Sequence, residues 1–193
     1  MSRIEYLGRL FPDARFIIPA RDPVRHIASL IKQHRLFCEE ESRNAKVLAY
    51  MQRAGHFGFG HDLRPINFGD PEAVMRIRNL WASGEEISGW AAYWASAYSF
   101  IADLLEKNKT LARRMLLVHY DDFCETSAET LWRVYRHCKL EVEDRVIEEQ
   151  SARISAPTYY KPEFSKAEIG AIEQETGQCM ERIQRFIGHR GDL

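Results

Sequence analysis

The chain has 193 residues, of which 45% are hydrophobic and 28% are charged, and these proportions are ordinary for a globular protein. Such a length is most simply one domain over residues 1–193, with enough apolar side chains to bury a core. The formal net charge of -1 excludes the general basic surface of a nucleic-acid-binding protein, so any site for an anion must be local.

The apolar pattern predicts many helices and two short strands. Residues 14–19 (ARFIIP) are too apolar for a strand with one solvated face, which is typical of parallel strands covered on both faces. Residues 115–119 (MLLVH) form the second apolar run. Helices are expected at residues 3–10, 23–37, 39–53, 72–82, 89–107, from about 127, at 141–153 and from 165 to about 187. Ser165 and Glu168 predict a capping box at the start of the last helix. The order of elements indicates an α/β fold with a parallel sheet flanked by helices. We expect strands 14–19 and 115–119 to be parallel and adjacent or nearly so, with Arg21 and Tyr120 at the same edge of the sheet.

Two strands make a small sheet, because a typical sheet has about five or six. The sequence therefore predicts either further strands that the pattern does not reveal or a chain that forms part of a larger domain. The loop at 55–71 is rich in Gly, Pro and aromatic residues, and loops of this length are usually functional or mobile.

Arg21 lies where the first strand ends and the next helix begins. Ligands of open α/β sheets bind at the carboxyl ends of strands, and a helix N-terminus attracts anions. A guanidinium there can grip a phosphate or sulfate with two N–H groups. Ser29 follows eight positions later and its hydroxyl is a second candidate ligand. The alternative is that Arg21 pairs with an acid such as Asp22, and that Ser29 is only a small residue at a helix contact.

The stretch FIIPARDPVRHIASL, residues 16–30, resembles the 3′-phosphate-binding segment of sulfotransferases that use 3′-phosphoadenosine 5′-phosphosulfate (PAPS). That family has a strand, an Arg-Asp-Pro or Arg-Asn-Pro turn, and a helix with Ser eight residues after the Arg. Residues 115–144 resemble a later family segment, an apolar strand followed by a Tyr-Glu-Asp-Leu-like turn and a helix, with Tyr120-Asp121-Asp122-Phe123 at the turn.

The resemblance implies a P-loop-NTPase-like sulfotransferase fold and transfer of a sulfuryl group from PAPS to a hydroxyl or amine of an unidentified small-molecule, carbohydrate or peptide acceptor. It implies that Arg21 and Ser29 bind the 3′-phosphate of PAPS or of adenosine 3′,5′-bisphosphate, without a metal. The family's 5′-phosphosulfate loop is not found before Phe11, so the chain resembles the C-terminal two-thirds of a sulfotransferase. We expect the sheet to be incomplete at its N-terminal side, the chain alone to be inactive, and its open strand edge to favour self-association. The alternative is a non-catalytic nucleotide-binding or interaction protein.

A late loop, residues 155–165, contains Lys161 beside Tyr159 and Tyr160. Sulfotransferases commonly bring a late basic or aromatic loop over the nucleotide, so the resemblance implies that Lys161 supplies charge to the bound nucleotide and that a tyrosine stacks on adenine. The alternative is an ordinary exposed loop.

The histidines offer weaker candidates. His26 is close to the proposed anion site in sequence, and His119 ends the second strand, but surface histidines are the default. The motif GHFGFGH, 55–61, lacks the spacing of a phosphate loop, and His56 and His61 have no third metal ligand, so we predict no metal.

Other features bear on location. The four cysteines show no CxxC pair and are expected to be free thiols in a reducing compartment. No apolar run reaches membrane-spanning length and no signal-peptide segment is present at the N-terminus, so the expected location is cytoplasmic.

Overall fold

The computed structural model describes residues 2–156 and 163–187, and these divide into two compact units. The first unit contains residues 2–22, 98–156 and 178–187, and the second contains residues 23–97 and 163–177. Two helices, Glu86–Lys107 (α5) and Lys166–Gln184 (α10), contribute residues to both units. The single domain expected over 1–193 therefore stays a prediction.

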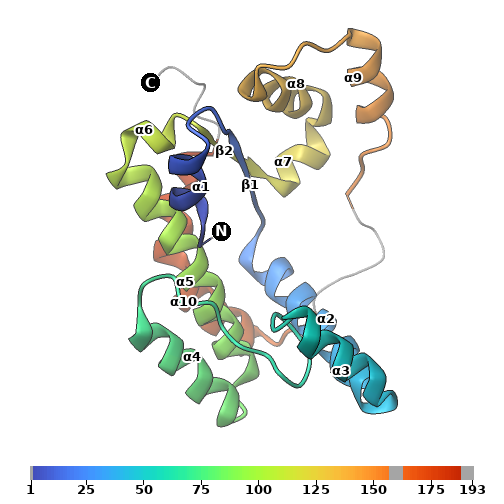
Figure 1. The fold of residues 1–193 in the computed structure, drawn as a ribbon, viewed down its shortest axis with the longest axis vertical. Helices are drawn as coiled ribbons and strands as arrows, with labels where there is room; N and C mark the ends of the chain where they lie inside the picture. The colour runs from blue at the N-terminus through green and yellow to red at the C-terminus, as the bar shows by residue number, and fades with distance from the viewer. Residues whose placement is uncertain (1, 157–162, 188–193) are drawn as a thin grey trace. The chain divides into compact units, whose positions relative to one another are not determined.

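The first unit contains a two-stranded sheet made of Phe16–Ala20 (β1) and Met115–His119 (β2). Its other complete elements are the helices Ile4–Leu10 (α1), Lys109–Ala112 (α6), Tyr120–Glu125 (α7), Ser127–Cys138 (α8) and Asp144–Ser151 (α9). The two strands lie side by side in Figure 1 and pair in parallel, with Phe16 opposite Met115 and Ala20 opposite His119. The α/β class and the parallel pairing of neighbouring strands are confirmed.

Only one face of β1 is buried. Ile18 and Ala20 are 5% and 1% exposed, whereas Ile17 between them is 42% exposed. Side chains of a strand alternate between its faces, so Ile17 and Pro19 share the exposed side. The expectation that this strand is covered on both faces is therefore wrong. Apolar composition shows that a strand can be buried, but it does not show how many faces find a packing partner.

The outer edge of β1, the edge that does not pair with β2, is occupied by Pro19. The Phe16 N–H donates to the Arg114 carbonyl oxygen at 2.7 Å, so every second residue from Phe16 directs its backbone towards β2. Pro19 consequently directs its backbone outward, where it has no N–H to offer. Its carbonyl oxygen accepts a hydrogen bond of 2.9 Å from the Tyr98 hydroxyl of α5. Both features reduce the capacity of this edge to pair with another strand.

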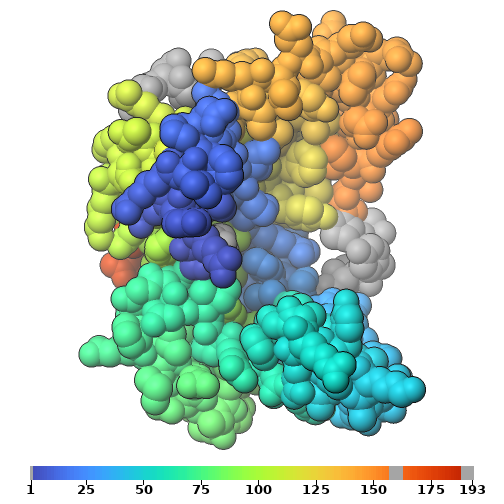
Figure 2. Space-filling model, in the orientation of Figure 1, coloured from blue at the N-terminus to red at the C-terminus, as the bar shows by residue number. Residues whose placement is uncertain are grey.

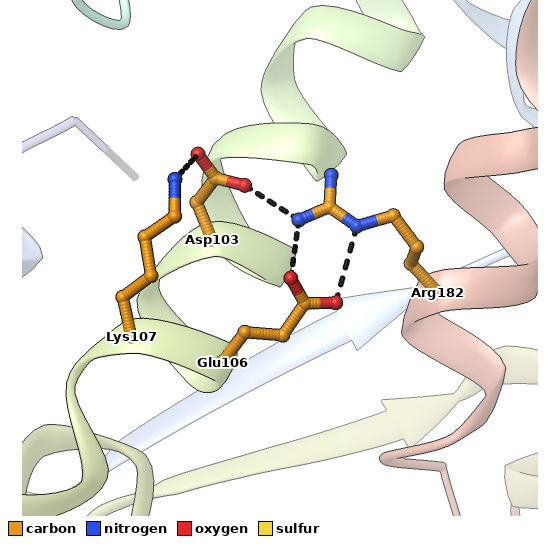
Figure 3. A network of polar contacts seen from close by, with 4 residues as sticks. All are labelled: Asp103, Glu106, Lys107 and Arg182. Atoms are coloured by element: carbon orange, nitrogen blue, oxygen red, sulfur yellow. Dashed lines mark hydrogen bonds and ion pairs between the residues drawn. The ribbon is translucent and has the colours of Figure 1, made fainter.

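An ionic network joins α5 and α10 within the first unit (Figure 3). Arg182 donates from Nη2 to Asp103 and Glu106, at 2.5 and 2.7 Å, and from Nε to Glu106 at 3.1 Å. Lys107 donates to the second oxygen of Asp103 at 2.7 Å. These hydrogen bonds lower the pKa of both carboxyl groups, chiefly through Lys107 at Asp103 and through Arg182 at Glu106.

The second unit is helical and contains Pro23–Arg43 (α2), Ala45–Ala54 (α3), Pro71–Ala82 (α4) and the first part of α5. Its core includes Ile27, Ile77, Trp90 and Ile172, which are each no more than 1% exposed. α3 has no buried residue and lies at the surface, where it is drawn in cyan in Figure 2.

Local capping signals set the ends of several helices. The predicted boundary between the second and third helices, at residue 38, is wrong, since α2 continues to Arg43. Asn44 ends it, because its side chain accepts from the Lys46 N–H and caps α3. The predicted capping box of α10 is confirmed, with the Ser165 N–H donating to Glu168 and the Glu168 N–H donating to the Ser165 hydroxyl.

Within the described ranges, every helix is too short or too polar to span a bilayer.

Candidate functional site

The carboxyl ends of β1 and β2 lie together, because the two strands are parallel and in register. Arg21 directly follows β1, and Tyr120 directly follows β2. Both residues belong to the first unit. The prediction that Arg21 and Tyr120 share one edge of the sheet is therefore confirmed. This is the edge at which open α/β sheets bind their ligands.

The Arg21 guanidinium lies over the Tyr120 ring, with its central carbon 5.0 Å from the ring centroid. A cation–π contact of this length stabilises a side-chain orientation by about 0.5–2 kcal/mol, depending on how far the pair is desolvated. Arg21 is half-buried, as is Tyr120. The cation–π contact thus restricts the orientation of the Arg21 side chain.

A second pair of titratable groups flanks this contact. His119 is the last residue of β2, and its side chain is 15% exposed. Its Nδ1 lies 3.7 Å from an Asp122 carboxylate oxygen, which is an ion pair only when the imidazole is protonated. Asp121 and Asp122 occupy the first turn of α7, where negative charge is favourable. The edge therefore combines one strong cation with nearby carboxylates, and the acid groups limit how much negative charge a ligand can bring close to α7.

Ser29 belongs to the second unit, on α2, and Arg21 belongs to the first. The Ser29 hydroxyl donates to the Arg25 carbonyl oxygen at 3.0 Å, a bond to the preceding helical turn that serine commonly makes. A shared anion site for Arg21 and Ser29 stays a prediction. Lys161, with Tyr159 and Tyr160, lies outside the described residues.

The remaining histidine candidates have packing partners. The Trp94 indole N–H donates to His26 Nδ1 at 3.1 Å, so that nitrogen is an acceptor. His56 stacks on Phe37 with ring centroids 5.1 Å apart. Within residues 2–156 and 163–187, no group of three metal-ligating side chains is placed to hold a metal ion. These contacts favour structural roles for His26 and His56.

Two contacts were not predicted from the sequence. The Arg21–Tyr120 cation–π contact joins residues about a hundred positions apart, and the Tyr98–Pro19 hydrogen bond joins residues 79 apart. The order of two apolar strands, each followed by a large polar or aromatic residue, was the available signal for the first contact. No local signal exists for the second, because the tyrosine lies in the middle of an apolar helix stripe.

Comparisons of the chain with models of known protein families, with curated protein sequences and with solved structures find no match.

Proposed function

We propose that the chain belongs to the sulfotransferase type and that its Arg21 holds the 3′-phosphate of PAPS or of adenosine 3′,5′-bisphosphate. Sulfuryl transfer to a hydroxyl or amine is the associated reaction. The observation that supports the proposal most strongly is the cation–π contact between the Arg21 guanidinium and Tyr120 at the carboxyl edge of the parallel strand pair.

The chemistry of Arg21 suits a phosphate ligand. A guanidinium has five N–H donors in one plane, and it binds phosphate oxygens through two parallel hydrogen bonds. The guanidinium lies over the Tyr120 ring, 5.0 Å from its centroid. This contact restricts the rotamers of Arg21. This preorganisation lowers the conformational entropy lost when an anion binds.

The proposed roles separate binding from chemistry. A contact to the 3′-phosphate supplies affinity and positions the donor, but it is remote from the sulfuryl group and lowers the barrier only indirectly. In-line transfer also needs cations at the 5′-phosphosulfate, where charge develops. Since a contact to the 3′-phosphate accounts for binding alone, the second candidate function is nucleotide binding without catalysis.

Calorimetric titration with adenosine 3′,5′-bisphosphate tests the binding proposal. Adenosine 5′-monophosphate and ATP serve as comparison ligands, because neither carries a 3′-phosphate. We expect Arg21→Ala to weaken binding by about 2–4 kcal/mol, the value of a lost bidentate contact to a charged group. Arg15→Ala is the matched control, since Arg15 precedes the same strand at its opposite end and its loss should leave the affinity unchanged.

Equal affinity for the 3′,5′-bisphosphate and the 5′-monophosphate would refute the assignment of Arg21. A separate assay with radiolabelled PAPS and phenolic, alcohol and carbohydrate acceptors distinguishes the two candidate functions. Binding without turnover supports the non-catalytic protein, whereas turnover that Arg21→Ala abolishes supports the transferase.

A further inference from the structure

The long segment between α3 and α4 is held against α2 by two hydrogen bonds to its backbone. The Gly60 N–H donates to His34 Nδ1 at 3.2 Å, and the His61 N–H donates to a Glu41 carboxylate oxygen at 2.6 Å. All four residues belong to the second unit. We call residues 55–68 the flap, and these two bonds attach its middle to α2.

Other contacts hold the flap at its sides. Ser42 lies 2.9 Å from His61 Nε2, and the Gln52 amide of α3 donates to Asp62 at 2.6 Å. Further along, the Ile66 N–H donates to the Tyr93 hydroxyl at 3.2 Å. The flap is therefore attached at several points, and most of its partners are hydroxyl, amide or carboxylate groups. The bond from Gly60 to His34 is different, because its acceptor is an imidazole nitrogen.

The Gly60–His34 bond exists in only one protonation state of the ring. To accept the Gly60 N–H, Nδ1 must carry no proton, so the proton of the neutral ring is on Nε2. A protonated imidazole presents N–H groups at both nitrogens and would oppose the Gly60 N–H. Histidine is the side chain whose ordinary pKa places this change between pH 5 and 8.

The groups around His34 come from three elements. On α2 they are Arg35, Cys38 and Glu41, on α5 the charged group is Glu86, and on the flap it is His61. Burial is the largest influence and lowers the pKa of His34 below 6.5, and Glu86 and Glu41 oppose this effect only in part. Packing supplies the burial, since the His34 ring meets the Trp90 ring edge-on with centroids 5.7 Å apart.

The second attachment, the hydrogen bond from the His61 N–H to Glu41, does not depend on protonation of His34. The Glu41 side chain is buried, at 4% exposed, and it accepts from the flap backbone as a carboxylate. Gly60 packs against the same carboxylate so closely that an added Cβ would overlap both of its oxygens. The two attachments therefore lie at adjacent flap residues, one sensitive to protonation of an imidazole and the other not.

We propose that the flap opens in response to pH. It is closed on α2 while His34 is neutral, and it loosens at Gly60 when mild acid protonates the His34 ring. The bond from His61 to Glu41 then remains as a hinge for residues 55–60. This inference is independent of nucleotide binding at Arg21, because it uses only residues of the second unit.

Amide hydrogen exchange of Gly60, measured by NMR from pH 7.5 to 5.0 and divided by the intrinsic exchange rate, tests the proposal. We expect protection of the Gly60 amide to fall about five- to tenfold, the equivalent of one lost hydrogen bond, with a midpoint below pH 6.5. The Ile66 amide is the internal reference, since its acceptor is the Tyr93 hydroxyl and its protection should not follow the same curve.

Two substitutions separate protonation from simple loss of the side chain. His34→Asn places an amide oxygen near the position of Nδ1, so it should keep Gly60 protected without the pH dependence. His34→Leu has no acceptor and should leave Gly60 unprotected at every pH. If a variant does not fold, ¹⁵N shifts of the wild-type ring provide the same information.

Those shifts should show an unprotonated Nδ1 at pH 7.5, and a proton on Nδ1 at that pH would overturn the proposal. Constant Gly60 protection between pH 7.5 and 5.0 would also overturn it, as would the same loss of protection in His34→Asn.

Discussion

Substituting Gly60 by alanine tests the close contact between the flap and α2. Gly60 has a φ angle of 86°, a conformation that an L-residue with a side chain rarely adopts. Its Cα also faces Glu41, and an added Cβ would lie 2.6 Å from the Glu41 carboxyl carbon. Alanine must therefore adopt an unfavourable backbone conformation and displace a buried carboxylate at the same time.

The magnitude follows from these two effects. A left-handed conformation costs about 1–2 kcal/mol for a residue with a Cβ. Displacing Glu41 breaks its hydrogen bond to the His61 N–H, and a bond to a charged group contributes about 1.5–3 kcal/mol. Partial relaxation of the flap reduces the sum, so we expect Gly60→Ala to lower the free energy of unfolding by about 2–4 kcal/mol.

Urea denaturation followed by circular dichroism measures this change, and two other flap glycines serve as controls. Gly55 has a φ of 69° with open space where a Cβ would be added, so Gly55→Ala reports the backbone cost alone. Gly58 has open space and no positive φ, so Gly58→Ala should change stability by no more than about 0.5 kcal/mol. If Gly60→Ala costs no more than Gly55→Ala, the argument from the Glu41 contact is refuted.

Two further substitutions test contacts of the first unit. Tyr98→Phe removes the hydroxyl that donates to Pro19; burial raises the pKa of Tyr98 to about 12, so it is a neutral donor at ordinary pH. We expect a loss of about 1 kcal/mol in urea denaturation, whereas Tyr6→Phe, at a 64% exposed tyrosine, should cause none. Arg182→Met removes three charged hydrogen bonds that are partly exposed to solvent, and we expect a loss of about 1–2 kcal/mol at pH 7. Because the pKa values of Asp103 and Glu106 are lowered in the folded chain, this difference between wild type and variant should shrink as the pH falls below their ordinary values of 3.8 and 4.5, and a difference that is constant down to pH 3 would contradict it.

Sequence reasoning succeeded where the signal was local or where chain order fixed the geometry. Ser165 and Glu168 are three residues apart, and their reciprocal hydrogen bonds need no tertiary partner. The shared edge of Arg21 and Tyr120 followed from two apolar runs and the rule for parallel connections. Both predictions used information contained within short segments.

Contacts that depend on the packing of distant segments were not predictable in this way. Nothing within residues 14–20 indicates that Ile17 remains exposed, because exposure depends on which helices cover the sheet. The acceptors of the flap backbone, His34 and Glu41, lie on a helix whose own pattern explains them as surface residues. Glycine at position 60 suggested a loop, but it did not identify the carboxylate that requires it.

The proline in β1 also affects the chain before it folds. Short uncharged apolar segments without proline are the type that stack into intermolecular β-sheets when a chain is exposed during synthesis or after heating, and FIIPA differs from them by its proline. Pro19 removes one backbone donor from every copy of the segment, so a growing stack would lack one hydrogen bond per chain. The residue that blunts the strand edge of the folded protein therefore also protects the unfolded chain from aggregation.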